Sequence, residues 1–175
     1  MRWELIKLKI REANINDVEG IAHAHLLSWR ETYRGIITES YLSNLSVEQR
    51  KKNWIWTFNH LNMNESICIA EEMDGRIVGF SNSGKNRSTE YDYDGELYAI
   101  YLLKEYQNKG IGRMLFEASV ERLRSSGYKR MMLWVLKDNL TLGFYQRFGG
   151  TVIGEKGVTI GEQELVELAV GWNVI

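Results

Sequence analysis

The sequence predicts an α/β domain in which helices pack on both faces of a mixed, mostly antiparallel sheet. A nearly continuous apolar segment, 97–103, is followed by a glycine-containing turn, a long amphipathic helix and a second apolar segment, 130–136. A strand, a helix and a strand in this order form a parallel pair with a right-handed crossover. Two hairpin patterns, at 66–84 and 151–172, add antiparallel strands to this central unit.

Composition narrows the class of protein. A length of 175 residues with 44% hydrophobic content fits one domain, residues 1–175, with a sizeable core. A net charge of −1 and a pI near 6.3 give no general field for nucleic acid. No apolar run approaches the roughly 20 residues that span a membrane, and the N-terminus lacks a signal-peptide core. The single cysteine, Cys68, fits a reducing compartment, so we expect a cytoplasmic protein that binds neither nucleic acid nor membrane.

The N-terminal region has the pattern of a strand followed by a helix. Charged and apolar residues alternate over 5–13, which predicts a strand. Asn14, or alternatively Asn16, would cap the helix that follows, and Gly35 would end it. The apolar side of this helix carries Val18, Ile21, Ala22, His25, Trp29 and Tyr33.

Two more helices and a hairpin precede the central strand. A short helix is expected over 38–45. The segment 46–49, Ser-Val-Glu-Gln, has the pattern of a capping box and opens a helix whose apolar line is Val47, Trp54, Phe58 and Leu61. Strands at 66–72 and 76–84 form a hairpin around 73–75, and a polar loop, 85–94, leads to the central strand.

The C-terminal half begins with the central strand 97–103, which we expect to be covered on both faces because it is apolar throughout. The following helix starts at Ile111 and ends before Gly127, a left-handed cap position. After the second buried strand, Asn139 would cap a short helix that reaches Phe148. Strands at 151–159 and 164–172 then close the sheet as a hairpin around 161–162.

Glycines 110 and 112 suggest an anion site at the start of the long helix. The first N–H groups of a helix have no intrahelical partner, and glycine lets an anion approach them closely. A dinucleotide-binding motif would need a third glycine where Leu115 stands.

Residues 79–86 nearly match a nucleotide P-loop. Asn86 replaces its Ser or Thr, and no apolar helical pattern follows, so the magnesium ligand and the helix that a P-loop requires are both missing.

With Gln107 included, the turn reads Q-x-x-G-x-G and resembles motif A of the GNAT superfamily of acyl-CoA N-acyltransferases. The resemblance extends upstream to E-L-x-x-I-Y and downstream to L-W-V-x-x-D-N and F-Y-x-x-x-G, and it covers 95–150 well. Lys104 stands where many relatives have proline, which changes the rigidity of the turn and leaves its donors intact. The resemblance implies a parallel strand pair that splays at its C-terminal ends to hold the pantetheine arm.

It also implies a set of residues that bind acetyl-CoA. Backbone at Ile100, Tyr101 and Leu102 would face the thioester, with the Leu102 N–H as the best donor to its carbonyl. Backbone and side-chain groups of the turn would hold the pyrophosphate, and these are Gln107, Asn108, Lys109, Gly110, Ile111, Gly112 and Arg113. Asn139 matches an asparagine that contacts the cofactor in this family.

Tyr145 and Glu96 are the candidate catalytic residues. Tyr145 matches the family tyrosine that returns a proton to the departing thiolate, although a tyrosine on a short amphipathic helix is also common core packing. Glu96 begins the central strand, near the expected position of the acceptor amine, and could take its proton through water. A charged residue at this position could equally be the solvated end of the strand.

The segment 29–37 resembles the wall of the acceptor pocket in related acyltransferases, so Trp29 and Tyr33 are candidate substrate-binding residues. Core packing is an alternative, because the two lie four residues apart on one helix face. No carboxylate or cysteine stands at metal-ligand spacing from His23, His25 or His60, and we expect no metal.

The expected function is transfer of an acetyl group from acetyl-CoA to a primary amine of a small molecule or peptide, by direct attack in a ternary complex. The alternative is a catalytically silent acyl-CoA-binding sensor. A nucleotide-binding domain built on 79–85 is a third and weaker interpretation. A homodimer is left open.

Overall fold

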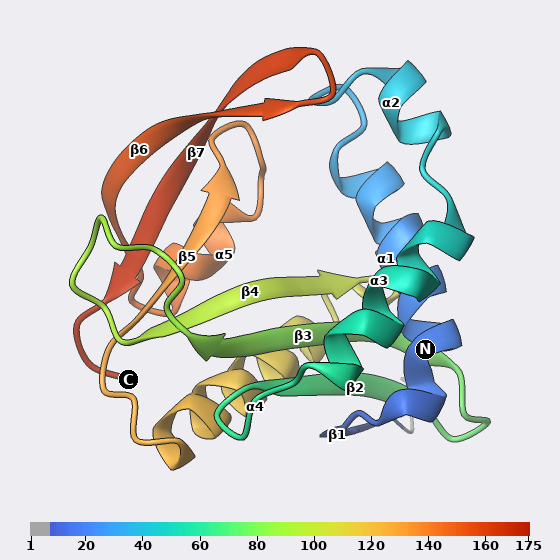
Figure 1. Ribbon diagram of the computed structural model, residues 1–175, viewed down its shortest axis with the longest axis horizontal. Coiled ribbons are helices and arrows are strands. Elements are labelled where there is room, and N and C mark those ends of the chain that lie inside the picture. The colour runs from blue at the N-terminus through green and yellow to red at the C-terminus, as the bar shows by residue number, and fades with distance from the viewer. Residues whose placement is uncertain (1–7) are drawn as a thin grey trace, which may run out of the picture.

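The computed structural model describes residues 8–175 and contains a seven-stranded sheet in the order β1-β2-β3-β4-β5-β7-β6 (Figure 1). Neighbouring strands are antiparallel except for β4 and β5, which confirms the expected mixed sheet. The strands are β1 Leu8–Glu12, β2 Ser66–Glu72, β3 Ile77–Lys85, β4 Gly95–Leu102, β5 Met131–Leu136, β6 Thr151–Ile160 and β7 Gln163–Trp172. The helices are α1 Val18–Thr32, α2 Glu39–Ser43, α3 Val47–Asn59, α4 Ile111–Ser125 and α5 Leu142–Arg147.

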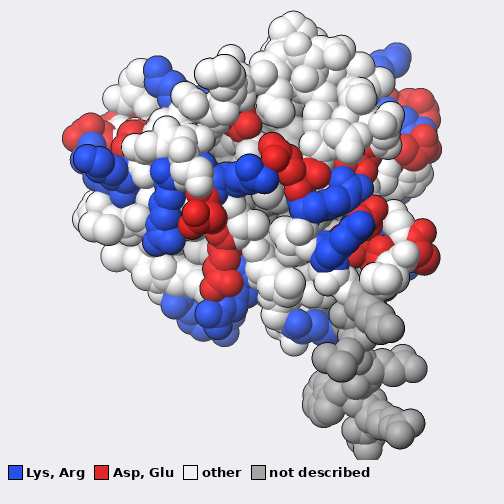
Figure 2. Space-filling view, turned by 90° about the horizontal axis from the view of Figure 1, so that it is seen from below, with Lys and Arg blue, Asp and Glu red and all other residues white. Residues whose placement is uncertain are grey.

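Helices cover both faces of the sheet, as expected (Figure 1). On one face, α1 and α3 enclose a core that contains Ile21, Trp54, Ile69 and Phe80. On the other face, α4 packs on β2, β3 and β4, while α5 packs against β5 and β7. Figure 2 shows a face on which acidic and basic side chains are interspersed, without a broad area of one sign.

The start of α1 is fixed by caps that were partly predictable. The Asn14 side chain accepts a hydrogen bond from Asn16 N (3.0 Å), and Asp17 Oδ2 accepts one from Asn14 N (2.8 Å). Asn14 therefore caps the 3-10 turn Ile15–Asp17, while Asp17 is the N-cap residue of α1 itself, so the prediction that Asn14 caps the helix holds for this preceding turn alone. Of the strand expected at 5–13, residues 5–7 lie outside the described residues.

A charged cluster joins β1, β2 and the start of α1. The Arg11 guanidinium donates to both oxygens of Asp17 (2.7 and 2.8 Å) and to both oxygens of Glu71 (2.9 and 3.0 Å). Lys9 Nζ lies 2.9 Å from Glu71. These contacts lower the pKa of Glu71 to about 2, chiefly through the hydrogen bond from Arg11.

Several predicted boundaries differ from the structure for local reasons. The capping box at the start of α3 is half formed, since Ser46 accepts from Gln49 N while the Gln49 side chain donates to Asn53. The prediction that Asn139 caps the helix before Phe148 is wrong, because α5 begins at Leu142 with Thr141 at its N-cap. Residues 77–85, which cover most of the P-loop-like stretch, form strand β3, so the nucleotide-binding interpretation is wrong too.

The feature that creates the site is the early separation of β4 and β5. They pair at Gly95↔Met131 and Glu96↔Met132, and no further pair follows. The register of β4 against β3 then slips, because Ser83 pairs with Leu97 and Asn82 pairs with Ala99, which leaves Tyr98 as a bulge. Residues 98–101 are half-buried, so the expectation that β4 is covered on both faces is wrong at these positions. They border open space.

Candidate active site

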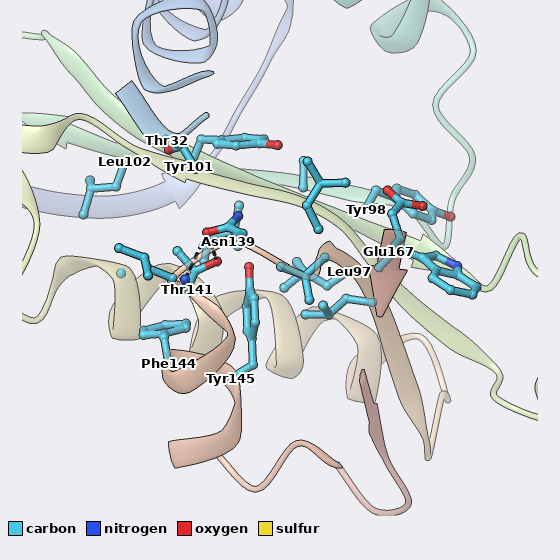
Figure 3. Close-up of a pocket in the computed structure, with 18 of the residues that line it drawn as sticks. Thr32, Leu97, Tyr98, Tyr101, Leu102, Asn139, Thr141, Phe144, Tyr145 and Glu167 are labelled. Carbon is cyan, nitrogen blue, oxygen red and sulfur yellow. Dashed lines mark hydrogen bonds between the residues drawn. The ribbon is translucent and has the colours of Figure 1, made fainter. Parts of the chain in front are cut away.

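A cavity of about 900 Å³ lies where β4 and β5 separate. Its walls come from the end of α1, from β4, from the turn before α4, from β5 and α5, and from the inner side of β6 and β7. Figure 3 shows Leu102 and Glu167 at opposite sides of this space, with Tyr145 between them. The volume is in the range of small-molecule and cofactor sites.

The backbone of β4 presents two donors to this cavity. Leu103 N donates to Val78 O on β3 (2.9 Å). Inward and outward positions alternate along an antiparallel pair, so the N–H groups of Ile100 and Leu102 point away from β3. Because β5 has already separated, these groups face the gap, which is the position that the sequence comparison with the GNAT motif implied for Leu102.

The turn before α4 presents a second set of donors. Asn108 and Gly110 both adopt left-handed backbone conformations, with φ of 58° and 82°. In residues 8–175, no group accepts a hydrogen bond from the backbone N–H groups of 108–113. These donors lie at the N-terminus of the 15-residue helix α4, where the helix dipole favours an anion. The arrangement fits a pyrophosphate.

The side chains of this turn are mostly engaged with the protein. Gln107 Nε2 donates to Leu102 O (3.1 Å), which ties the turn to β4. Lys109 Nζ lies 5.5 Å from the centre of the Tyr106 ring, and Arg113 pairs with Glu117 on α4 (2.7 Å). Ile111 is buried in the core. The turn therefore offers mainly backbone N–H groups to a ligand.

Tyr145 projects from α5 into the cavity. Its ring packs edge-on against Phe144 and Trp172, and its hydroxyl points toward Asn139 in Figure 3. Burial raises the pKa of Tyr145 above its ordinary value, so the phenol carries its proton at neutral pH. A protonated, positioned phenol can donate a proton to a leaving group.

Asn139 also lines the cavity, and its local role is to shape the chain before α5. Its Oδ1 accepts from Thr141 N (3.0 Å) and from Thr141 Oγ1 (2.9 Å). This is an Asx turn, in which a side chain replaces a backbone acceptor. Because Asn139 lines the cavity, its side-chain amide nitrogen can donate a hydrogen bond to a ligand carbonyl.

Trp29 and Tyr33 border the cavity from the end of α1, and both also pack against neighbours, so the two interpretations of these residues are compatible. The Tyr33 and Tyr101 hydroxyls are 2.9 Å apart. Burial raises the pKa of Tyr33 to about 12. His25 stacks on Tyr101 and accepts from Trp54 Nε1 (3.2 Å). Burial lowers the pKa of His25 to about 3, so it is a neutral structural residue.

Glu96 borders the cavity but is held by Arg87. Its Oε2 accepts from Arg87 N (2.8 Å) and Nε (3.2 Å), and its Oε1 accepts from Arg87 Nη2 (2.7 Å). Glu96 is 3% exposed. The Arg87 guanidinium also stacks over the ring of Tyr98, at 3.9 Å from its centre. Both carboxylate oxygens thus already have a cationic partner.

Glu167, on β7, is a cavity residue that the sequence did not identify (Figure 3). It is half-buried and pairs across the sheet with Leu136 on β5 and Lys156 on β6. The alternation of side chains along β7 did mark Glu167, because it falls on the same side of the strand as the apolar Leu165 and Ala169. Finding it required knowing that this side faces a cavity.

Within residues 8–175, no helix combines the length and apolar character needed to cross a bilayer. The same stretch contains no group of three or more His, Cys, Asp or Glu side chains arranged to hold a metal ion.

The class of protein that has this fold and this cavity is that of the N-acetyltransferases. The chain belongs to the acetyltransferase (GNAT) family, whose model matches residues 18–150. The chain is 36% identical over 163 residues to YuaI, an uncharacterized N-acetyltransferase of Bacillus subtilis, across 93% of this chain and 91% of YuaI.

Two further similarities come from Thermoplasma acidophilum. The chain is 26% identical over 149 residues to its spermidine N(1)-acetyltransferase, across 82% of this chain and 88% of that protein. The fold is similar to the crystal structure of PaiA N-acetyltransferase in complex with coenzyme A, with a TM-score of 0.74 and 24% identity over 94% of this chain and 97% of that one.

Proposed function

We propose that this acetyltransferase moves an acetyl group from acetyl-CoA to a primary amine of a small molecule or peptide, by direct attack in a ternary complex. One observation carries the proposal: the free N–H groups of β4, the free N–H groups at 108–113 and the Tyr145 hydroxyl border one cavity. Acetyl-CoA needs a donor for the carbonyl oxygen of its thioester, a proton for the adjacent sulfur when it departs, and donors for its pyrophosphate. These three kinds of group supply them. The relatives named as spermidine and spermine acetyltransferases act on small molecules with primary amines, which supports this acceptor class.

In the proposed complex, backbone N–H groups of Asn108 to Arg113 bind the pyrophosphate, and the pantetheine arm lies along the open edge of β4. The Leu102 N–H donates to the thioester carbonyl oxygen, and the Asn139 amide contacts the arm. Donors fixed in place before the reaction stabilise the negative charge that develops on this oxygen. Gln107 supports the arrangement indirectly, since it fixes the backbone of Leu102.

The amine nitrogen attacks the carbonyl carbon and forms a tetrahedral intermediate. The carbon–sulfur bond then breaks, and the departing sulfur takes the proton of the Tyr145 hydroxyl. The proton lost by the amine goes to a carboxylate at the acceptor side of the cavity. Glu96 can take it only through a water molecule or after Arg87 moves, because Arg87 already binds both of its oxygens.

The test is release of free thiol from acetyl-CoA in the presence of a panel of amines. The panel contains polyamines, amino acids, an aminoglycoside, a peptide with a free N-terminus and a lysine peptide. We expect acetylation of at least one amine, with product mass confirming a single added acetyl group. Tight acetyl-CoA binding without turnover of any amine would instead indicate the silent sensor.

A further inference from the structure

The acceptor side of the cavity contains two carboxylates with different surroundings. Glu96 accepts three hydrogen bonds from Arg87. The Glu167 carboxylate forms no side-chain hydrogen bond or ion pair with any residue in the range 8–175, although it borders the same cavity. A partly buried carboxylate without a partner is costly, so its presence at a cavity wall suggests that a ligand completes it.

We propose that Glu167 is the residue that binds the ammonium group of the acceptor and takes its proton before the attack. This inference rests on the proposed function and assigns the acceptor-binding residue of that same site. A carboxylate on β7 lies across the cavity from the open edge of β4, so an amine bound to it lies between Glu167 and the thioester (Figure 3).

The neighbours of Glu167 fit a cationic ligand. On β6, Lys156 faces it across the strands but places its ammonium 3.7 Å from the centre of the Trp134 ring. A positive nitrogen is therefore already stable over an indole face at this wall, on the strand that pairs with the strand of Glu167. On β5, the partner of Glu167 is the apolar Leu136.

The remaining charged and titratable neighbours are Glu96 from β4, with its partner Arg87, and Tyr33 from the end of α1. Burial raises the pKa of Glu167, Lys156 opposes this shift, and the negative charge of Glu96 adds to it. A raised pKa improves Glu167 as an acceptor for a proton from an ammonium group.

The proton balance is simple. The acceptor arrives as R–NH₃⁺ and transfers one proton to the Glu167 carboxylate, which leaves a neutral amine with a free electron pair. After the attack, the nitrogen loses a second proton as the intermediate collapses, and this proton restores the Tyr145 hydroxyl, which has given its own proton to the departing sulfur. The Glu167 carboxylic acid then returns its proton to solvent through the mouth of the cavity. No group outside the two substrates and water is required.

The test compares Glu167→Gln with Glu96→Gln and with Glu164→Gln, which lies exposed on the other side of β7. The amine is spermidine or, where spermidine is not acetylated, the most active amine of the panel. We expect Glu167→Gln to lower kcat/KM by about 100-fold at pH 7, the lower end of the range for general base catalysis. The deficit should shrink at high pH, where the amine is already neutral.

Three readouts separate this role from a structural one. Acetyl-CoA affinity and Tm should not fall in Glu167→Gln, the acidic limb of the pH profile of kcat/KM should move up to the pKa of the amine, and Glu167→Asp should recover part of the rate. Glu164→Gln should match the wild type.

An unchanged pH profile in Glu167→Gln, with wild-type activity, would overturn the inference while leaving the proposed function intact. So would the same shift of the acidic limb in Glu96→Gln alone, which would assign the proton to Glu96. If the wild type acetylates no amine at all, the proposed function fails and this inference fails with it.

Discussion

Glu96 and Met132 are the last paired residues of β4 and β5, and the cavity is lined from Glu96 onward along β4 and from Leu133 onward along β5. The bulge at Tyr98 follows at once, and from there β4 bonds to β3 alone. The donors of Ile100 and Leu102 consequently face a ligand site rather than a neighbouring strand.

Tyr145→Phe removes the hydroxyl and keeps the ring, with its contacts to Phe144 and Trp172. We expect acetyl-CoA affinity to change little and the chemical step to slow by about 100-fold, the lower end of the range for general acid catalysis, because a thiolate is already a fair leaving group. Single-turnover rates measured beside the dissociation constant check this. An unchanged rate would make Tyr145 a packing residue, and lost affinity would assign it to the cofactor wall.

Gly112→Asp should abolish acetyl-CoA binding while the fold remains. A like charge at about 4 Å costs about 4 kcal/mol at an effective dielectric constant of about 20, so we expect affinity to fall at least about 100-fold. Tm should stay the same or rise, since an acidic residue in the first turn of a helix is favourable.

Gly112→Ala is the matched control. Its added Cβ would meet the Phe144 ring at 3.7 Å, an ordinary contact, and φ at this position is not left-handed. We expect this variant to keep most of the affinity. Calorimetry showing normal binding in a folded Gly112→Asp variant would mean that the phosphates bind elsewhere.

Arg87→Ala should destabilise the protein, because it leaves the buried Glu96 carboxylate without its guanidinium. Loss of a partner for a buried polar group costs about 1–3 kcal/mol, and the exposure of Arg87 favours the lower half of that range. Urea unfolding measures the change. In a double-mutant cycle with Glu96→Gln, the two effects should not add, since the neutral amide no longer needs the cation. Additive effects would show that the pair contributes nothing to stability.

The cluster of Arg11 with Asp17 and Glu71 predicts a pH dependence of stability. The pKa of Glu71 is about 2 in the folded protein and near 4.5 in an ordinary environment, so the unfolded chain binds protons more readily. The contribution to stability is therefore complete above about pH 4.5 and is lost as the pH falls toward about 2. The same direction holds for Asp17.

Arg11→Gln tests this contribution. At pH 7 it should lower the free energy of unfolding by about 1.5–3 kcal/mol, the range for hydrogen bonds to charged groups. The stability curves of the variant and the wild type should approach each other as the pH falls to about 2. A constant difference at every pH would contradict the assignment.

Local sequence patterns predicted the order of the elements well, because each depends on residues close together in the chain. The cap at Asn14 on the turn before α1, the left-handed Gly127 and the two hairpins all arise in this way. The short apolar run 97–103 marked β4 correctly. Its half-buried middle was not predictable, because that depends on where β5 separates.

The parts of the site that were missed depend on distant segments. The Tyr98 bulge follows from the pairing of β3 with β4. The hydrogen bonds from Arg87 to Glu96 depend on the path of the loop 86–94. Glu167 became a candidate only when β7 was placed beside the cavity. Asn139 was assigned to a helix cap because an Asx turn and an N-cap have the same residue preference.

The two-pair contact between β4 and β5 divides the sheet into two nearly separate halves, β1–β4 and β5–β7–β6. Such halves can open independently, and amide hydrogen exchange reports each opening by itself. We expect the amides of β5 and β7 to exchange at rates unlike those of β2 and β3 in the free protein. Acetyl-CoA bonded to β4 on one side and packed against β5 on the other would join the halves, so that both become protected together.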